Sequence, residues 1–211
     1  MKLLQHEASG AVTHPAPHAT QLIRLVHAAP WLMDALRAAR ALRLASWCIG
    51  AGAIRTLVWD HLHGRDVPSD LADIDVVFFD AADLSSQQER LLASQLAQAV
   101  PDVAWEVVNQ AAVHRWFLQQ RGQDVPPLSS LAEGVASWPE YATCVGVYLD
   151  RADEVQVIAP HGLEDLFQMV VRWNPMRASA ADYAQRVTQK RFAQRWPLVE
   201  VMPPGENSSS S

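Results

Sequence analysis

Residues 47–55 have the sequence Trp47-Cys48-Ile49-Gly50-Ala51-Gly52-Ala53-Ile54-Arg55. The apolar run from Leu44 to Ile49 predicts a buried strand, and the two glycines after it predict a tight turn. A helix is expected from Ala53 to Leu62, with Gly64 as its C-cap residue. Because glycine lets a backbone approach a ligand closely and a helix N-terminus attracts phosphate, this turn is a candidate phosphate site. Many tight turns have the same pattern, so the turn alone is weak support.

A second stretch places two carboxylates at the start of an apolar strand, in the sequence Asp73-Ile74-Asp75-Val76-Val77-Phe78-Phe79. Side chains two residues apart on a strand point to the same face, roughly 6.6 Å apart at the backbone. Carboxylates that close repel each other, and a divalent cation relieves the repulsion. Hard oxygen ligands select Mg²⁺ or Mn²⁺. The alternative is that Asp73 ends a loop and Asp75 caps a turn.

A third carboxylate, Glu106, lies inside the apolar run Val103–Val108, which predicts a further strand. If this strand lies beside the strand of Asp75, then Glu106 completes a three-carboxylate site. The alternative is a glutamate that faces outward on an edge strand.

The remaining patterns predict a protein in which strands and helices alternate, of the α/β or α+β class with a mixed sheet. Ser85 and Gln88 resemble a capping box for a helix that reaches Ala99. The other expected helices span residues 21–28, a segment starting at Pro30, 110–120 and 129–137, and the segment 162–196 is expected to be helical. The other expected strands span residues 143–149 and 155–158, joined as a hairpin. The tryptophans expected to fill the core are Trp47, Trp59, Trp105, Trp116 and Trp138.

The 211 residues predict one domain with flexible ends. We expect a flexible arm at residues 1–19, a single domain at 20–200 and a disordered tail at 201–211. Within the domain, residues 44–110 form the expected core and residues 111–200 the C-terminal extension.

Composition excludes several classes of protein. A formal net charge of -6 argues against a broad basic face for duplex DNA. Two cysteines cannot build a disulfide framework and suit a reducing cytoplasm. No apolar stretch approaches the ~20 residues that a membrane-spanning helix needs.

The order of these motifs resembles the nucleotidyltransferase superfamily, which is built on a fold like that of DNA polymerase β. More narrowly, it is similar to a bacterial family of small nucleotidyltransferase-like proteins. The supporting stretches, spread between about residues 44 and 198, are residues 47–55, Val58–Gly64, Asp73–Val76, Trp105–Ala111, Trp138–Glu140, Ala159–Phe167 and Arg195–Pro197. The resemblance implies a polymerase-β-like fold, with a mixed sheet flanked by helices and a C-terminal helical and hairpin extension.

The resemblance also implies a reaction, the transfer of a nucleoside monophosphate from an NTP to an acceptor hydroxyl. Asp73, Asp75 and Glu106 would be the catalytic, metal-binding carboxylates, with Mg²⁺ or Mn²⁺ as cofactor. The backbone N–H groups that would hold the β- and γ-phosphates belong to Gly50, Ala51, Gly52 and Ala53.

Four basic side chains are candidate phosphate contacts. Arg55 lies about one turn into the helix, where a surface or ion-paired arginine is equally expected. Arg186, Lys190 and Arg191 recur at helical spacing near the C-terminus, where a solvated helix face is the commoner case.

The leading hypothesis is an enzyme that acts on a small molecule, a protein side chain or an RNA end. The alternative is a catalytically degenerate module that binds nucleotides or another protein. Ala51 and Ala53 favour the alternative because neither offers a hydroxyl to phosphate, whereas the three carboxylates favour the enzyme. A purely structural partner protein would not need the carboxylates.

Overall fold

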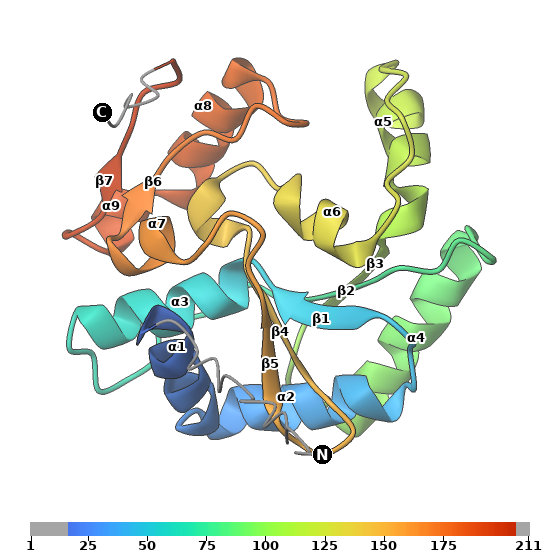
Figure 1. Ribbon diagram of the computed structural model, residues 1–211, viewed down its shortest axis with the longest axis horizontal. Coiled ribbons are helices and arrows are strands. Elements are labelled where there is room, and N and C mark those ends of the chain that lie inside the picture. The colour runs from blue at the N-terminus through green and yellow to red at the C-terminus, as the bar shows by residue number, and fades with distance from the viewer. Residues whose placement is uncertain (1–16, 206–211) are drawn as a thin grey trace, which may run out of the picture.

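The computed structural model describes residues 17–205, and at its centre lies a five-stranded mixed sheet (Figure 1). The strand order is β3-β2-β1-β4-β5. β1 runs antiparallel to β2 and β4, β4 runs antiparallel to β5, and β2 runs parallel to β3. The strands span Trp47–Gly50 (β1), Ile74–Phe78 (β2), Trp105–Asn109 (β3), Gly146–Leu149 (β4) and Val155–Ile158 (β5). The expected mixed sheet is therefore confirmed.

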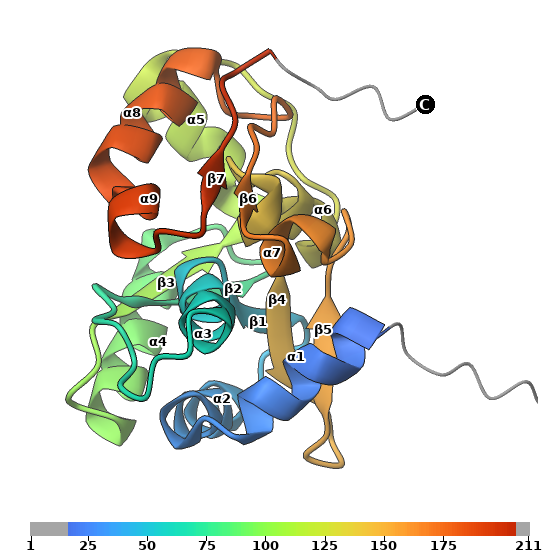
Figure 2. The same ribbon diagram turned by 90° about the vertical axis from the view of Figure 1, so that its left-hand side faces the viewer.

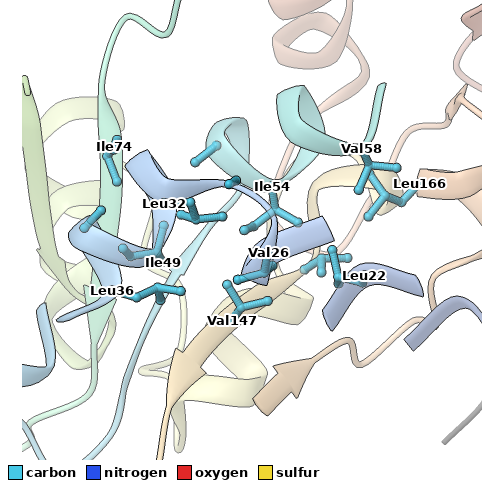
Figure 3. Packing of buried hydrophobic residues seen from close by; sticks show 14 of the residues in the cluster. Leu22, Val26, Leu32, Leu36, Ile49, Ile54, Val58, Ile74, Val147 and Leu166 are labelled. Atoms are coloured by element: carbon cyan, nitrogen blue, oxygen red, sulfur yellow. The ribbon is translucent and has the colours of Figure 1, made fainter. Parts of the chain in front are cut away.

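One face of the sheet is covered by four helices, which enclose the main hydrophobic core. These helices are α1 (Pro17–His27), α2 (Pro30–Ala41), α3 (Gly52–Leu62) and α4 (Ser86–Ala99). Figure 3 shows Ile49, Ile74 and Val147 of the sheet packed against Leu32, Leu36 and other helix residues. Since side chains alternate along a strand, the neighbours of these residues face the other side of the sheet.

That second face is only partly covered. The short helix α6 (Leu131–Ala136) packs Leu131 and Val135 against Cys48 and Val77. A 3-10 turn, η1 (Gln110–Ala112), and helix α5 (Val113–Arg121) follow β3 directly. In both Figure 1 and Figure 2, α5 and α8 rise on the side of the sheet opposite α2 and α4.

The C-terminal third packs at the end of α3. It comprises α7 (Glu164–Phe167), β6 (Val170–Val171), α8 (Ala180–Lys190), α9 (Phe192–Arg195) and β7 (Glu200–Val201). Helix α7 contacts the 3-10 turn η2 (Tyr141–Thr143), which lies before β4 in the chain. The expectation of an essentially helical segment at 162–196 is wrong at β6, which pairs in parallel with β7. Trp196 and Phe192 meet the ring of Trp59 edge to face. These contacts attach the C-terminal third to α3.

Several local expectations can be compared directly with the structure. Ser85 caps α4 by accepting a hydrogen bond from the backbone N–H of Gln88, as expected, but the capping box is incomplete. The Ser85 N–H donates to Asp83 and the Gln88 side chain donates to Asp80 instead. The expectation that Trp116 fills the core is wrong, because Trp116 is 49% exposed on α5 and lines an open cleft. The expected arm and tail fall largely on residues 1–16 and 206–211, which lie outside the described residues. Residues 17–19 form the start of α1 and residue 201 ends β7, so the ordered fold extends slightly further at both ends.

Within residues 17–205, the helices are too short or too polar to cross a membrane.

Candidate active site

The two strands that carry the carboxylates lie side by side. β2 and β3 are parallel, and Asp75 is the register partner of Glu106. Both residues alternate with buried neighbours such as Val76 and Val107, so both face the open side of the sheet. Partner residues on adjacent strands are about 4.8 Å apart. Asp73 immediately precedes β2 and lies two residues before Asp75, so the alternation of the strand places it on the same face as Asp75.

The charges around Asp75 identify the groups that share this site. Burial raises the pKa of Asp75 to about 6, and the negative charges of Asp73 and Glu106 add to the rise. Lys190 and Arg186 oppose it. Two carboxylates on or next to the sheet and two cations from α8 therefore act on Asp75, although at least 80 residues separate the acidic and basic groups along the chain.

The donor chemistry of these carboxylates fits a hard divalent cation. Carboxylate oxygens are the ligands that Mg²⁺ and Mn²⁺ prefer, and a cation would offset the repulsion that raises the pKa of Asp75. In the conformation described for residues 17–205, no three His, Cys, Asp or Glu side chains are grouped tightly enough to enclose an ion. The assignment of Asp73, Asp75 and Glu106 as ligands thus stays a prediction.

The glycine turn is tightly packed beneath the site. A Cβ atom at Gly50 would lie 2.5 Å from the Trp138 ring and 2.9 Å from the Val145 carbonyl oxygen, so only glycine fits there. Ala51 has φ +48° and ψ -112°, a backbone conformation that normally requires glycine. Its N–H donates to the Val145 carbonyl at 3.2 Å. Because Ala51 supplies no side-chain cap, the N–H groups open to a ligand are those of the first turn of α3.

Arg55 is enclosed by aromatic rings beside this turn. It is 3% exposed, and its guanidinium carbon lies 5.6, 5.2 and 5.3 Å from the ring centroids of Trp59, Phe192 and Trp196. Its Nε and Nη1 atoms are buried without a hydrogen-bond partner. Burial lowers the pKa of Arg55 to about 10, and the nearby charge of Glu140 opposes the shift. Arg55 is thus a buried cation with unused donors, rather than the surface or ion-paired arginine that was the alternative.

The basic wall of the site comes from the C-terminal third. A cleft lies beside the carboxylates on the open side of the sheet. Arg186 and Lys190 of α8 line this cleft, together with Arg195 of α9. Arg186 donates from Nε to Oε1 of Glu140 at 2.5 Å. Arg191, the third basic candidate on this segment, adopts φ +51° at the end of α8 and does not line the cleft.

Two of these residues were missed by reasoning from the sequence. Glu140 and Arg195 lie in stretches that carried the family resemblance, but nothing in the sequence assigned them a chemical role. Only packing brings Glu140 next to α8 and Arg195 close to Arg55.

The cleft that joins these groups has a volume of about 960 Å³. Seven of the nine residues predicted for the site line it: Ala51, Gly52, Arg55, Asp73, Asp75, Glu106 and Lys190. The other two, Gly50 and Ala53, are buried and support the turn from below.

Comparison with known proteins gives a consistent result. A family model described as nucleotidyltransferase matches residues 37–201. The chain is similar to a protein solved by NMR and described as a CCA-adding enzyme head domain. The two are 26% identical with a TM-score of 0.73, over 87% of this chain and 95% of that chain. No curated protein matches the sequence.

Two further structures share the fold. One is apo form II of a CCA-adding enzyme, with a TM-score of 0.52, 15% identity and coverage of 85% of this chain and 44% of that chain. The other is the Thermotoga maritima CCA-adding enzyme complexed with tRNA, with a TM-score of 0.50, 15% identity and coverage of 87% and 42%. This chain therefore spans less than half the length of those two enzymes.

Proposed function

Because this chain belongs to the nucleotidyltransferase family, we propose that it transfers a nucleoside monophosphate from an NTP to an acceptor hydroxyl. The observation that carries the proposal is the in-register pair of Asp75 and Glu106, which shares a cleft with Arg55, Arg186 and Lys190. A carboxylate cluster opposite a basic cluster matches the two needs of the reaction. The acidic groups activate the acceptor, and the basic groups hold the triphosphate.

The triphosphate binds at the basic end of the cleft. The open N–H groups in the first turn of α3 and the helix dipole attract its terminal phosphates. Arg55 lines this end of the cleft, and its fixed position among three rings limits the entropy lost on binding. Arg186 and Lys190 add positive charge from the opposite wall.

The acceptor reacts at the acidic end. Its hydroxyl oxygen forms a bond to the α-phosphorus while the bond from that phosphorus to the β-bridging oxygen breaks, and pyrophosphate leaves. The carboxylate of Glu106, an exposed residue, receives the hydroxyl proton. Asp73, Asp75 and Glu106 would hold Mg²⁺ or Mn²⁺, which when bound supplies charge stabilisation for the attacking and leaving oxygens.

The acceptor is a small molecule, a protein side chain or an RNA end. The likeness to a CCA-adding enzyme head domain supports an RNA end, whereas the net charge of -6 argues against a long duplex. NTP as substrate and two buried, unpaired cysteines both suit a cytoplasmic enzyme.

Calorimetric titration of each NTP into the full chain, with and without Mg²⁺, tests the nucleotide site. We compare the wild type with the double variant Asp73→Asn/Asp75→Asn and with a matched control, Asp102→Asn/Asp124→Asn, whose carboxylates are exposed outside the cleft. The proposal is supported if NTP binding depends on Mg²⁺ and is lost in Asp73→Asn/Asp75→Asn but kept in the control variant. If no NTP binds to the wild type, the proposal is wrong.

A second function, nucleotide binding without turnover, is favoured by one observation. Neither Ala51 nor Ala53 offers a hydroxyl, and the N–H of Ala51 is already bonded to Val145. Binding of an α-³²P-labelled NTP without transfer of the label to any member of a panel of hydroxyl acceptors would select this alternative.

A further inference from the structure

The cleft continues past the carboxylates along helix α5. This helix follows β3 and η1 without a break, so the strand that carries Glu106 also places α5 at the rim of the same cleft. The volume of about 960 Å³ is at the upper end of the range for sites that bury one drug-sized ligand. The cleft thus has space for a second group beside the NTP.

Trp116 offers an aromatic surface in this part of the cleft. It is 49% exposed although tryptophan is usually well buried, and it lines the cleft. Phe117 meets its ring edge to face, with centroids 5.2 Å apart and an interplanar angle of 88°. The guanidinium carbon of Arg121 lies 5.3 Å from its centroid. An exposed ring supported by such neighbours is a platform on which a nucleobase can stack.

Three arginines line the cleft outside the triphosphate end. Arg121 lies against the Trp116 ring, and Arg121 and Arg177 both lie over the neighbouring Phe117 ring. Arg115 and Arg121 come from α5, and Arg177 comes from the segment before α8. Arg177 donates from Nη2 to the Pro126 carbonyl at 2.6 Å, while its Nη1 is buried without a partner. Asp182 pairs with Arg121 and offsets one of the three charges. This end of the cleft therefore keeps a net positive charge in a chain whose net charge is -6.

We propose that Trp116, Arg115, Arg121 and Arg177 bind the acceptor, and that the acceptor is a nucleotide residue. Its base stacks on Trp116, its phosphate pairs with the arginines, and its ribose hydroxyl faces Glu106. This inference rests on the proposed function, because it assigns the acceptor side of the same reaction. A nucleotide carries both an aromatic base and a phosphate, which matches the pairing of an exposed ring with guanidinium groups. A free nucleotide and the 3′ end of an RNA share this chemistry.

The test measures acceptor binding separately from turnover. AMP and a five-nucleotide single-stranded RNA are titrated into the full chain. The titrations are repeated with Mg²⁺ and a saturating NTP analogue whose α–β bridge is a methylene, which cannot be transferred. The variants are Trp116→Ala, Trp116→Phe and the control Leu118→Ala, which removes an exposed side chain on α5 that does not line the cleft. Thermal unfolding of each variant checks that the fold is kept.

We expect Trp116→Ala to weaken binding of at least one probe by fivefold or more, which corresponds to about 1 kcal/mol for one stacked base. Trp116→Phe should recover part of this loss, and Leu118→Ala should bind like the wild type. Ribose 5-phosphate, which has no base, should bind the wild type and Trp116→Ala equally. Arg115→Gln should reduce the salt dependence of binding. Equal nucleotide affinity in the wild type and Trp116→Ala, or no binding of either probe, would overturn the inference.

The two nucleotide probes identify the source of the acceptor. Tighter binding of the RNA identifies an RNA end, and equal affinities identify a free nucleotide. Failure of this inference is distinguishable from failure of the proposed function. If transfer occurs but Trp116→Ala leaves the acceptor KM unchanged, only the inference is wrong. If no NTP binds while Trp116-dependent nucleotide binding persists, the proposed function is wrong and the nucleotide site stands.

Discussion

Arg186 of α8 donates a hydrogen bond from Nε to Oε1 of Glu140, a residue with no exposed surface. The other carboxylate oxygen of Glu140 accepts a hydrogen bond from Thr143 at 2.9 Å. Glu140 lies in the segment between α6 and η2, so this pair attaches α8 to the part of the chain that packs behind the glycine turn. The position of the basic wall therefore depends on a buried carboxylate 46 residues away.

Arg186→Ala should lower the free energy of unfolding by about 2 to 3 kcal/mol, because it leaves the charge of Glu140 buried and unpaired. The matched control is Arg37→Ala, which breaks an exposed pair with Asp34 and should cost less than about 1 kcal/mol. Urea denaturation measures both. Similar losses in the two variants would show that burial of Glu140 adds nothing to the pair.

Gly50→Ala should destabilise the protein by about 1 to 3 kcal/mol, because the new methyl group would overlap the Trp138 ring and the Val145 carbonyl. Gly52→Ala is the control, since the nearest atom to its Cβ is Arg55 Nη2 at 3.9 Å. Thermal unfolding should separate the two variants clearly. The close approach at Gly50 would be contradicted by equal melting temperatures.

Ala51→Gly should raise the free energy of unfolding by about 1 kcal/mol. The backbone of Ala51 is strained at φ +48° and ψ -112°, which costs on the order of 1 to 3 kcal/mol, and glycine relieves this strain at a smaller entropic cost. Ala97→Gly on the exposed side of α4 should instead lose about 0.5 to 1 kcal/mol. Chemical denaturation of both variants gives the sign, and a loss at Ala51 would contradict the strain.

Asp75→Asn should stabilise the metal-free protein at pH 7.5 but not at pH 4. The pKa of Asp75 rises from 3.8 to about 6 on folding, so the folded state binds the proton more tightly than the unfolded state. The contribution of this proton to the stability of the folded state is fully present below about pH 4 and is lost as the pH rises through 6. Asparagine avoids the loss, which corresponds to about 1 to 3 kcal/mol.

Urea denaturation in EDTA at the two pH values measures this difference, with Asp102→Asn as the control. A stability gain of the same size at both pH values would contradict the raised pKa of Asp75.

Arg55→Met should weaken NTP binding by about tenfold or more, because a charge-assisted hydrogen bond contributes about 1.5 to 3 kcal/mol. Binding of a nucleoside monophosphate should change much less, since Arg55 lies at the end of the cleft assigned to the terminal phosphates. Arg191→Met is the control, because this arginine does not line the cleft. Equal losses for NTP and monophosphate in a calorimetric titration would place Arg55 elsewhere on the ligand.

Local patterns predicted the strands and helices of the core well. The apolar run at residues 74–79 and the cap at Ser85 appear in the structure close to their expected positions. The pairing of β6 with β7 was missed because each strand has only two residues, too few to show a periodicity. Trp116 was misplaced because residue type alone does not reveal which side of a helix meets solvent.

The sequence by itself determined where carboxylates interrupt apolar strands and where a glycine turn meets a helix, because alternation and backbone freedom are local properties. The tertiary structure alone decided that Asp75 and Glu106 pair in register and that Arg55 is buried among aromatic rings. It also decided that Arg186 and Lys190 act on Asp75. These relationships join segments far apart in the chain, and their geometry follows from how the segments pack rather than from any one of them.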